Sequence, residues 1–347
     1  MDYLSVNLTQ ITLKLRYFLG IDIGKKTFHA ALTVDGQNFY DQEVSNEPKA
    51  IRQYFQELKS KFSFSPDQLI VCMEHTGIYC YPALDYLLKQ KIGVCVESAL
   101  RIKQSQGMQR GKNDKVDAKR IARYAYKNAD ELTFWKPKRL VLQELRALLV
   151  LRERLVQAKN QFEVPIKESS EFIEESIRKI SVKNCKATVV AIRKDLKNVD
   201  IAIAKLIKSD AKLDQQVKIA TSVTGIGPII ATNMIITTNE FNDITAHKKY
   251  ACYAGIAPFE HSSGSSIRGR TKVSHMANKK IKTLLHLGAR SAVQASPELK
   301  QYYHRKLSEG KHPLLVLNAV CNKLICRVFV CIKNNRLYEK NYQSALA

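Results

Sequence analysis

The sequence lacks the cysteine spacings that build metal sites or disulfide frameworks. Its eight cysteines include no CxxC pair and no Cys/His arrangement of the zinc type, so a structural zinc site is not expected. Cys321, Cys326 and Cys331 are each five residues apart, which scatters them around a helix rather than gathering them on one face. We therefore expect reduced, mostly buried thiols.

A long hydrophobic run and a secretory start are also missing. The most apolar stretch, 314–332, is interrupted by polar and charged residues, so no membrane span is expected. The chain opens with Asp2 and has no basic start followed by an apolar block, so no signal peptide is expected. We interpret the sequence as a cytoplasmic protein whose 347 residues form two or three domains.

Acidic residues are scarce toward the C-terminus. Residues 248–347 carry 18 Lys and Arg but only 4 Asp and Glu, which is more than half of the chain's net charge of +24. A folded segment with this imbalance repels itself unless a polyanion neutralises it, and nucleic acid is the usual polyanion. An acidic membrane surface is the weaker alternative, because the segment lacks an obvious amphipathic anchor.

Apolar runs and turn residues in the first segment predict an α/β domain. The expected strands are 17–23, 27–34, 37–44, 69–73 and 92–96, with Asp35-Gly36 as a two-residue hairpin turn. The expected helices begin at Pro48, Tyr81 and Asn113, and a loop is expected over 98–112. Strand, strand, strand, helix, strand, helix, strand, helix is the order of a ribonuclease-H-like sheet.

Four carboxylates fall at strand ends or at a helix start in this pattern. Asp22 lies near the end of the first strand and Glu74 ends the fourth, while Asp114 and Asp117 begin the last helix three residues apart, on one face. Mg²⁺ needs several oxygen ligands, and phosphoryl transfer with two metals needs carboxylates that converge from separate elements. A structural role, with Asp114 as a helix cap and Asp117 as a partner of the helix dipole, is the alternative for those two alone. The four together favour a metal site over that alternative, and over an actin-like or sugar-kinase fold, which lacks its second glycine-rich loop here.

The middle of the chain, 140–217, is long, charged and nearly free of helix breakers. Apolar residues recur at helical spacing in two seams, which predicts two antiparallel helices or a coiled coil between subunits. The first seam includes Leu142, Leu145, Leu149, Val156 and Phe162, and the second includes Val190, Leu196, Val199, Ile203, Leu206 and Leu213. The expected domains are therefore 1–134, a helical arm over 135–217, and a mostly helical domain over 218–347.

The final segment contains a glycine turn, a serine cluster and basic residues. Gly225 and Gly227 lie between two short predicted helices, as in a helix-hairpin-helix turn that binds phosphate through its N–H groups, with a simple tight turn as the alternative. Four serines flank Gly264, in a pattern that is also typical of flexible loops. The candidate nucleic-acid contacts are Gly225, Gly227, Arg268, Arg270, Lys272, Lys279 and Lys280. Tyr302 and Tyr303 are candidates for base stacking or for the core.

Five segments together resemble one family. They are GIDIGKKTFHAAL, MEHTGIYCYPALDYL, GKNDKVDAKRIARYA, TSVTGIGPIIATNM and YAGIAPFEHSSGSSIRGRTKVSHMANKKIKTLL. Over nearly its whole length the chain resembles the DEDD-type insertion-sequence transposases, the group of the Piv/MooV-like invertases and the bridge-RNA-guided serine recombinases. The combination of DxxDA with the late SGSS-x-RG sequence is specific to the group, although the single pieces are not.

The resemblance implies a fold, a site and partners. It implies a RuvC-like domain, a coiled-coil arm and a C-terminal transposase domain. Asp22, Glu74, Asp114 and Asp117 match the tetrad that would hold Mg²⁺ (or Mn²⁺), and Ser263 matches the family's serine nucleophile, with Ser262 beside it. The implied partners are donor and target DNA, a structured guide RNA encoded by the element, and further copies of the chain in a dimer or tetramer.

Three functions from different classes remain open on the sequence. The first is a DNA recombinase that uses the acids together with Ser263. The second is a metal-dependent nuclease of the Holliday-junction-resolvase type, in which water is the nucleophile. The third is a nucleic-acid-binding protein in which the acids are structural.

Overall fold

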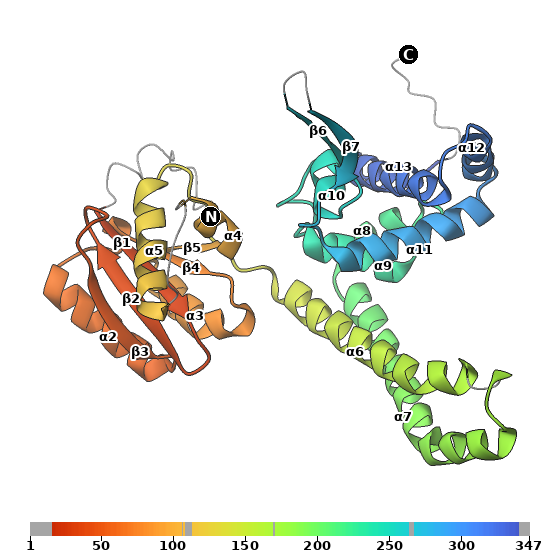
Figure 1. The fold of residues 1–347 in the computed structure, drawn as a ribbon. Coiled ribbons are helices and arrows are strands. Elements are labelled where there is room, and N and C mark those ends of the chain that lie inside the picture. Colours follow the sequence, from red (N-terminus) through yellow and green to blue (C-terminus); the bar gives the residue numbers. More distant parts are fainter. Residues whose placement is uncertain (1–15, 106, 108–112, 169–170, 264–266, 340–347) are drawn as a thin grey trace. The chain divides into compact units, whose positions relative to one another are not determined.

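The structure, a computed structural model, describes residues 16–105, 107, 113–168, 171–263 and 267–339 (Figure 1). Contacts divide the chain into two compact units with a boundary between Pro137 and Lys138. The predicted boundary after residue 134 lies close to this point. The contacts do not separate 135–217 from 218–347, so the three-part division stays a prediction.

The first unit is built on a five-stranded mixed sheet with the order β3-β2-β1-β4-β5. β1 pairs antiparallel with β2 and β2 with β3, whereas β4 is parallel to β1 and β5 to β4. This is the ribonuclease-H-like order that the sequence predicts. The strands are β1 (Tyr17–Ile23), β2 (Thr27–Thr33), β3 (Tyr40–Ser45), β4 (Leu69–Glu74) and β5 (Gly93–Glu97).

Helices cover both faces of this sheet because the strands alternate buried side chains between them. On one face Leu19, Ile21 and Val71 pack with α2 and α3, and on the other Phe18, Ile70 and Cys72 pack with α4 and α5. Figure 1 shows α5 lying along the strands. The helices are α2 (Pro48–Phe62), α3 (Tyr81–Lys89), α4 (Ala99–Gln104) and α5 (Asp114–Lys127), with 3-10 turns at Pro66–Gln68 and Gly77–Cys80.

Two local predictions in this unit are wrong. The β2–β3 connection is not a two-residue turn but runs over 34–39, because the Asp35 side chain accepts hydrogen bonds from the Gln37 and Asn38 amides and folds a longer loop. The expected loop over 98–112 contains α4, which begins where the Ser98 hydroxyl accepts a hydrogen bond from the Arg101 amide.

The described part of the second unit is helical apart from one hairpin. Helix α13 lies in its core, where Val320, Leu324 and Val328 are fully buried. Among the described residues α13 is the one helix long and apolar enough to cross a membrane by length and composition, but half of its apolar window is buried in this core. The elements are α6 (Leu140–Glu168), α7 (Glu175–Lys208), α8 (Ala211–Thr221), α9 (Pro228–Thr237), α10 (His247–Tyr253), β6 (Pro258–Ser263), β7 (Ile267–Val273), α11 (Lys279–Ala295), α12 (Pro297–Ser308) and α13 (Pro313–Lys333).

Helices α6 and α7 form the predicted helical pair, which we call the arm (Figure 1). Leu142, Leu145 and Leu149 pack against Val199 and Ile203, so the base of both seams is buried. In the distal half the chain itself leaves Phe162 37% exposed and Val190 56% exposed, so the predicted coiled coil between subunits stays open there. Helix α7 ends at Lys208 and α8 begins after its N-cap Asp210, so Leu213 of the predicted second seam belongs to a separate helix.

The cysteines are free and mostly buried, as the sequence predicts. Burial raises the pKa of Cys95 and Cys321 to about 12, so both thiols are unreactive at neutral pH.

Candidate active site

A row of titratable side chains crosses the sheet at the end of β1. Asp22 lies opposite His29 on β2, which lies opposite Glu43 on β3. On the other side β4 runs parallel to β1 with Ile21 opposite Met73, so Glu74 is the next residue in register beside Asp22. Glu74 in turn lies opposite Glu97 on β5. Paired residues of neighbouring strands share a face, so all five side chains lie on the face that α5 covers.

Helix α5 brings the other two predicted acids to this row. Its N-cap is Asn113, whose side chain accepts a hydrogen bond from the Lys115 amide at 2.9 Å. The capping role considered for Asp114 is therefore wrong, and this exposed carboxylate is free for another role. The helix approaches β1 very closely, since a Cβ at Gly20 would lie 2.2 Å from the Ala122 nitrogen and 2.3 Å from the Ala118 oxygen. Only glycine permits this contact, two residues before Asp22.

The four predicted carboxylates act on one another electrostatically. The pKa of Asp22 is raised from its ordinary value of 3.8 to about 6, mainly by partial burial and then by the charges of Asp114, Asp117 and Glu74, in that order of size. His29 opposes the shift. Such mutual repulsion is what a bound divalent cation would relieve.

The donor set fits a hard divalent cation in its chemistry. Four carboxylates from β1, β4 and α5 supply only oxygen ligands, which Mg²⁺ and Mn²⁺ prefer. Within the described residues, however, no three His, Cys, Asp or Glu side chains come close enough to form a closed ligand set. Asp117 is held instead by Arg120, at 2.6 Å between Oδ1 and the guanidinium.

Sequence reasoning missed the neighbours of the acids. His29 lies 3.8 Å from Glu43, and Arg101 on α4 holds the buried Glu97 at 3.3 Å. Lys115 and Lys119 both bind Asp41 on β3 at 2.8 Å. The Arg101–Glu97 pair is local, four residues apart, whereas the other contacts are revealed only by the strand register and the path of α5, because their partners are far apart in the sequence.

The predicted nucleophile lies in the second unit. Ser263 is the last residue of β6, and its Cα pairs with Ile267 at the start of β7. The hairpin of β6 and β7 extends beyond the helices around it (Figure 1). The side chains of Ser263, Ser262, Arg268 and Arg270 lie outside the described part of the structure.

The remaining predicted nucleic-acid contacts have different environments. Lys272 and Lys279 are exposed on β7 and at the start of α11. Lys280 is not free, because it binds Glu153 on α6 at 2.6 Å and ties α11 to the arm. Tyr302 packs partly against the core with Lys323 over its ring, 4.7 Å from the centroid, which favours the core role.

The glycine turn between α8 and α9 has a structural reason of its own. Gly225 has a φ of +94°, and a Cβ there would lie 2.5 Å from the Gly288 oxygen on α11. Glycine is therefore required for the turn and for helix packing. A Cβ at Gly227 would meet nothing within 4 Å, so that residue borders open space.

Comparison with known protein families gives two matches, one in each half of the chain. A DEDD transposase model of the IS110 type matches residues 19–168, which include all four acids. A model of the IS116/IS110/IS902 transposase family matches residues 217–304, which include Ser263. The chain belongs to the IS110/IS116 family of DEDD transposases. The family consists of transposases and invertases, enzymes that cleave and rejoin DNA.

Relatives of this IS110-type transposase agree with that assignment. It is 25% identical to the pilin gene-inverting proteins of Moraxella bovis and Moraxella lacunata, over 93% of its own chain and 98% of theirs. It is 28% identical to the 43.6 kDa protein of insertion element IS110 from Streptomyces coelicolor, over 35% of its chain and 30% of that protein. Among solved structures it is similar to RuvC of Thermus thermophilus, with a TM-score of 0.27 and 14% identity, over 34% of its chain and 99% of RuvC.

Proposed function

We propose that this transposase cuts and rejoins DNA through a covalent phosphoserine intermediate at Ser263, with Mg²⁺ or Mn²⁺ held by Asp22, Glu74, Asp114 and Asp117. The observation that supports it best is the convergence of these carboxylates from the ends of β1 and β4 and the first turn of α5, where their charges help to raise the pKa of Asp22 to about 6. A purely structural role would not require four carboxylates to be gathered where they repel one another.

The proposed chemistry is a pair of transesterifications. The Ser263 hydroxyl loses its proton and attacks a DNA phosphorus, the bond to the leaving sugar oxygen breaks, and that oxygen takes up a proton. A sugar hydroxyl of a second strand then attacks the phosphoserine, which joins the two DNA segments and returns the free serine. When bound, the cation would stabilise the charge that develops on the phosphate oxygens.

The basic final hundred residues support nucleic acid as the partner. We propose that Lys272, Lys279, Arg268 and Arg270 contact phosphates of the donor and target DNA, or of a structured guide RNA encoded by the element. Lys280 is a weaker candidate than the sequence suggests, because Glu153 already neutralises it.

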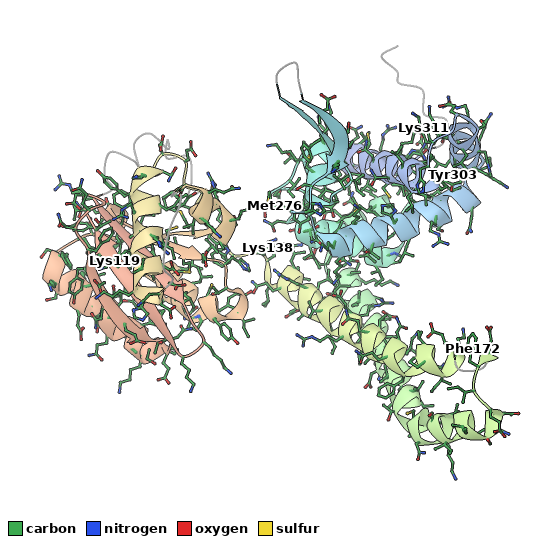
Figure 2. The ribbon with its side chains drawn as sticks, in the orientation of Figure 1. Lys119, Lys138, Phe172, Met276, Tyr303 and Lys311 are labelled. Atoms are coloured by element: carbon green, nitrogen blue, oxygen red, sulfur yellow. The ribbon has the colours of Figure 1, made fainter. Side chains whose placement is uncertain are left out.

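We further propose that the transposase is a homo-oligomer, joined through a coiled coil at the distal half of the arm. Figure 2 labels Phe172 at the far end of the arm, where this side chain is 85% exposed. Ile177, Ile180 and Val190 are each more than half exposed along α7. Apolar surface of this kind is typical of an interface between subunits.

A nuclease that uses water as its nucleophile is the alternative function. It is favoured by the same carboxylates and by the RuvC-like strand order, neither of which requires a serine. In that case Ser263 would be a loop residue without a chemical role.

DNA cleavage on a denaturing gel tests the proposal. Purified wild type, with the candidate element-encoded RNA, matching DNA and Mg²⁺, should break the DNA strands, and both EDTA and Asp117→Asn should abolish the break. Binding, measured by gel shift, should survive in Asp117→Asn. Cleavage that survives in Asp117→Asn or in EDTA would refute the metal site, and cleavage that survives in Ser263→Ala would favour the water-using nuclease.

A further inference from the structure

Helix α5 carries basic residues at intervals of four, and the first three of them bind the β2–β3 hairpin. Lys115 and Lys119 lie 2.8 Å from Asp41, and the Arg123 guanidinium donates a hydrogen bond to the Gly36 carbonyl oxygen at 3.0 Å. In isolation this stripe is typical of a solvated or phosphate-binding helix face. The structure instead uses it to attach the helix to the sheet (Figure 2 labels Lys119 on α5).

Asp41 is the centre of this attachment. Lys115 binds its Oδ2 and Lys119 binds its Oδ1, so both carboxylate oxygens are engaged. The Asp41 side chain is only 19% exposed, and hydrogen bonds from the two lysines lower its pKa. A half-buried carboxylate that bridges two cations holds them more firmly than an exposed surface pair does.

The attachment acts at the end of the helix that carries the two predicted acids, because Asp114 and Asp117 both lie in the first turn of α5. Lys115 lies between Asp114 and Asp117 in the chain, and Lys119 follows Asp117 by two residues. Attraction of these lysines to Asp41 therefore acts on the turn that carries the two acids.

We infer that Asp41 is a positioning residue. Through Lys115 and Lys119 it holds the first turn of α5, and with it Asp114 and Asp117, beside the end of β1. Asp41 itself touches neither DNA nor cation in this inference, which rests on the proposed metal site. It acts on the site as an outer partner of a metal ligand does, by fixing where the ligand lies.

Binding of Mn²⁺ to the full chain, followed by electron paramagnetic resonance of the free ion, tests this inference. Asp41→Asn should weaken Mn²⁺ binding by about tenfold, the usual loss for an outer partner of a ligand. Asp85→Asn is the matched control, because it breaks an exposed 2.6 Å pair with Lys89 in the same unit, and it should leave binding unchanged. Asp41→Glu, which keeps the charge, should recover most of the affinity, and circular dichroism checks that each variant folds.

The double variant Lys115→Met/Lys119→Met separates positioning from simple electrostatics. Removing two positive charges near a cation site should tighten Mn²⁺ binding if charge alone matters, whereas loss of the attachment should weaken it about as much as Asp41→Asn does. Adding Asp41→Asn to the double variant should then cost nothing further. Tighter binding in the double variant, or an Asp41→Asn affinity within twofold of wild type, would overturn the inference. Wild type that binds no Mn²⁺ would refute the proposed metal site itself, and the inference with it.

Discussion

Asp22 is the residue whose ionisation is opposed by burial and by the three neighbouring carboxylates. Its pKa is raised to about 6, first by burial and then by the other three carboxylates. The raised value means that ionising Asp22 destabilises the metal-free fold. A cation would reverse this effect, because it favours the ionised form of every ligand.

Ionisation of Asp22 should therefore destabilise the metal-free transposase, relative to Asp22→Asn, as the pH rises from 4 to above 6. Because the pKa of Asp22 is higher in the folded state than its ordinary 3.8, the protonated carboxyl stabilises the fold. This stabilisation is fully present below pH 3.8 and is lost as the pH rises through 6, and it amounts to about 2–3 kcal/mol for a shift of this size. Denaturant unfolding of the full chain from pH 4 to 8 measures it, with Asp22→Asn as the reference that lacks the group. An identical pH dependence in both proteins would show that Asp22 is not perturbed.

Sequence reasoning found the four acids because each marks the end of a strand or the start of a helix. It could not find Asp41, His29 or Glu97, since their roles depend on register and on the path of α5. Gly20 could not be singled out either, because nothing in a strand sequence shows that a helix backbone will lie against it.

At the scale of elements, a charged network fixes the base of the arm. Arg139 binds Asp210 at the N-cap of α8 at 2.7 Å, and Glu240, in the turn after α9, at 2.8 Å. The Glu240 side chain is only 2% exposed, and Lys212 adds a contact at 3.5 Å. Asn239, Glu240 and Phe241 all have positive φ, a strained backbone that persists only when its surroundings hold it.

Breaking this network should strongly destabilise the second unit. Arg139→Met leaves the buried Glu240 without its main partner and should cost about 3 kcal/mol in unfolding free energy. Arg193→Met, which breaks an exposed 2.9 Å pair with Glu163 in the same arm, should cost less than about 1 kcal/mol. Urea unfolding of both variants makes the comparison, and equal costs would contradict a specific role for the network.

The elements of the second unit were harder to predict than those of the first. Amphipathic spacing indicated two arm helices, but it could not show that only their base is covered within the chain. Val190 continues the seam in sequence yet is 56% exposed. Short helices such as α4 depend on one capping contact and are easily missed by periodicity.

At the scale of the whole molecule, charge is the dominant feature. The net charge of +24 is concentrated in 248–347, where several basic side chains already have acidic partners, such as Arg327 with Glu298 and Lys306 with Glu309. Only basic residues without such partners can release counterions when nucleic acid binds.

Nucleic-acid binding should therefore depend on salt through particular residues. Replacing Arg268 and Arg270 with Ala should weaken binding and reduce the slope of log K against log salt by about one for each phosphate that is no longer neutralised. Lys306→Ala, which removes a side chain paired with Glu309, should leave the slope nearly unchanged. Fluorescence anisotropy between 50 and 300 mM salt, roughly the range in which such slopes are resolved, gives both values. An unchanged slope in the arginine variant would remove these residues from the interface.

The most direct test of the proposed mechanism is to map the covalent link between protein and DNA. Wild type would react with its DNA, candidate RNA and Mg²⁺, and the adduct would be digested and sequenced by mass spectrometry. We predict a nucleotide attached to Ser263, an adduct that persists in Ser262→Ala, and no adduct in Ser263→Ala or Asp117→Asn. Strand cleavage without any adduct, or an adduct at another residue, would contradict Ser263 as the nucleophile.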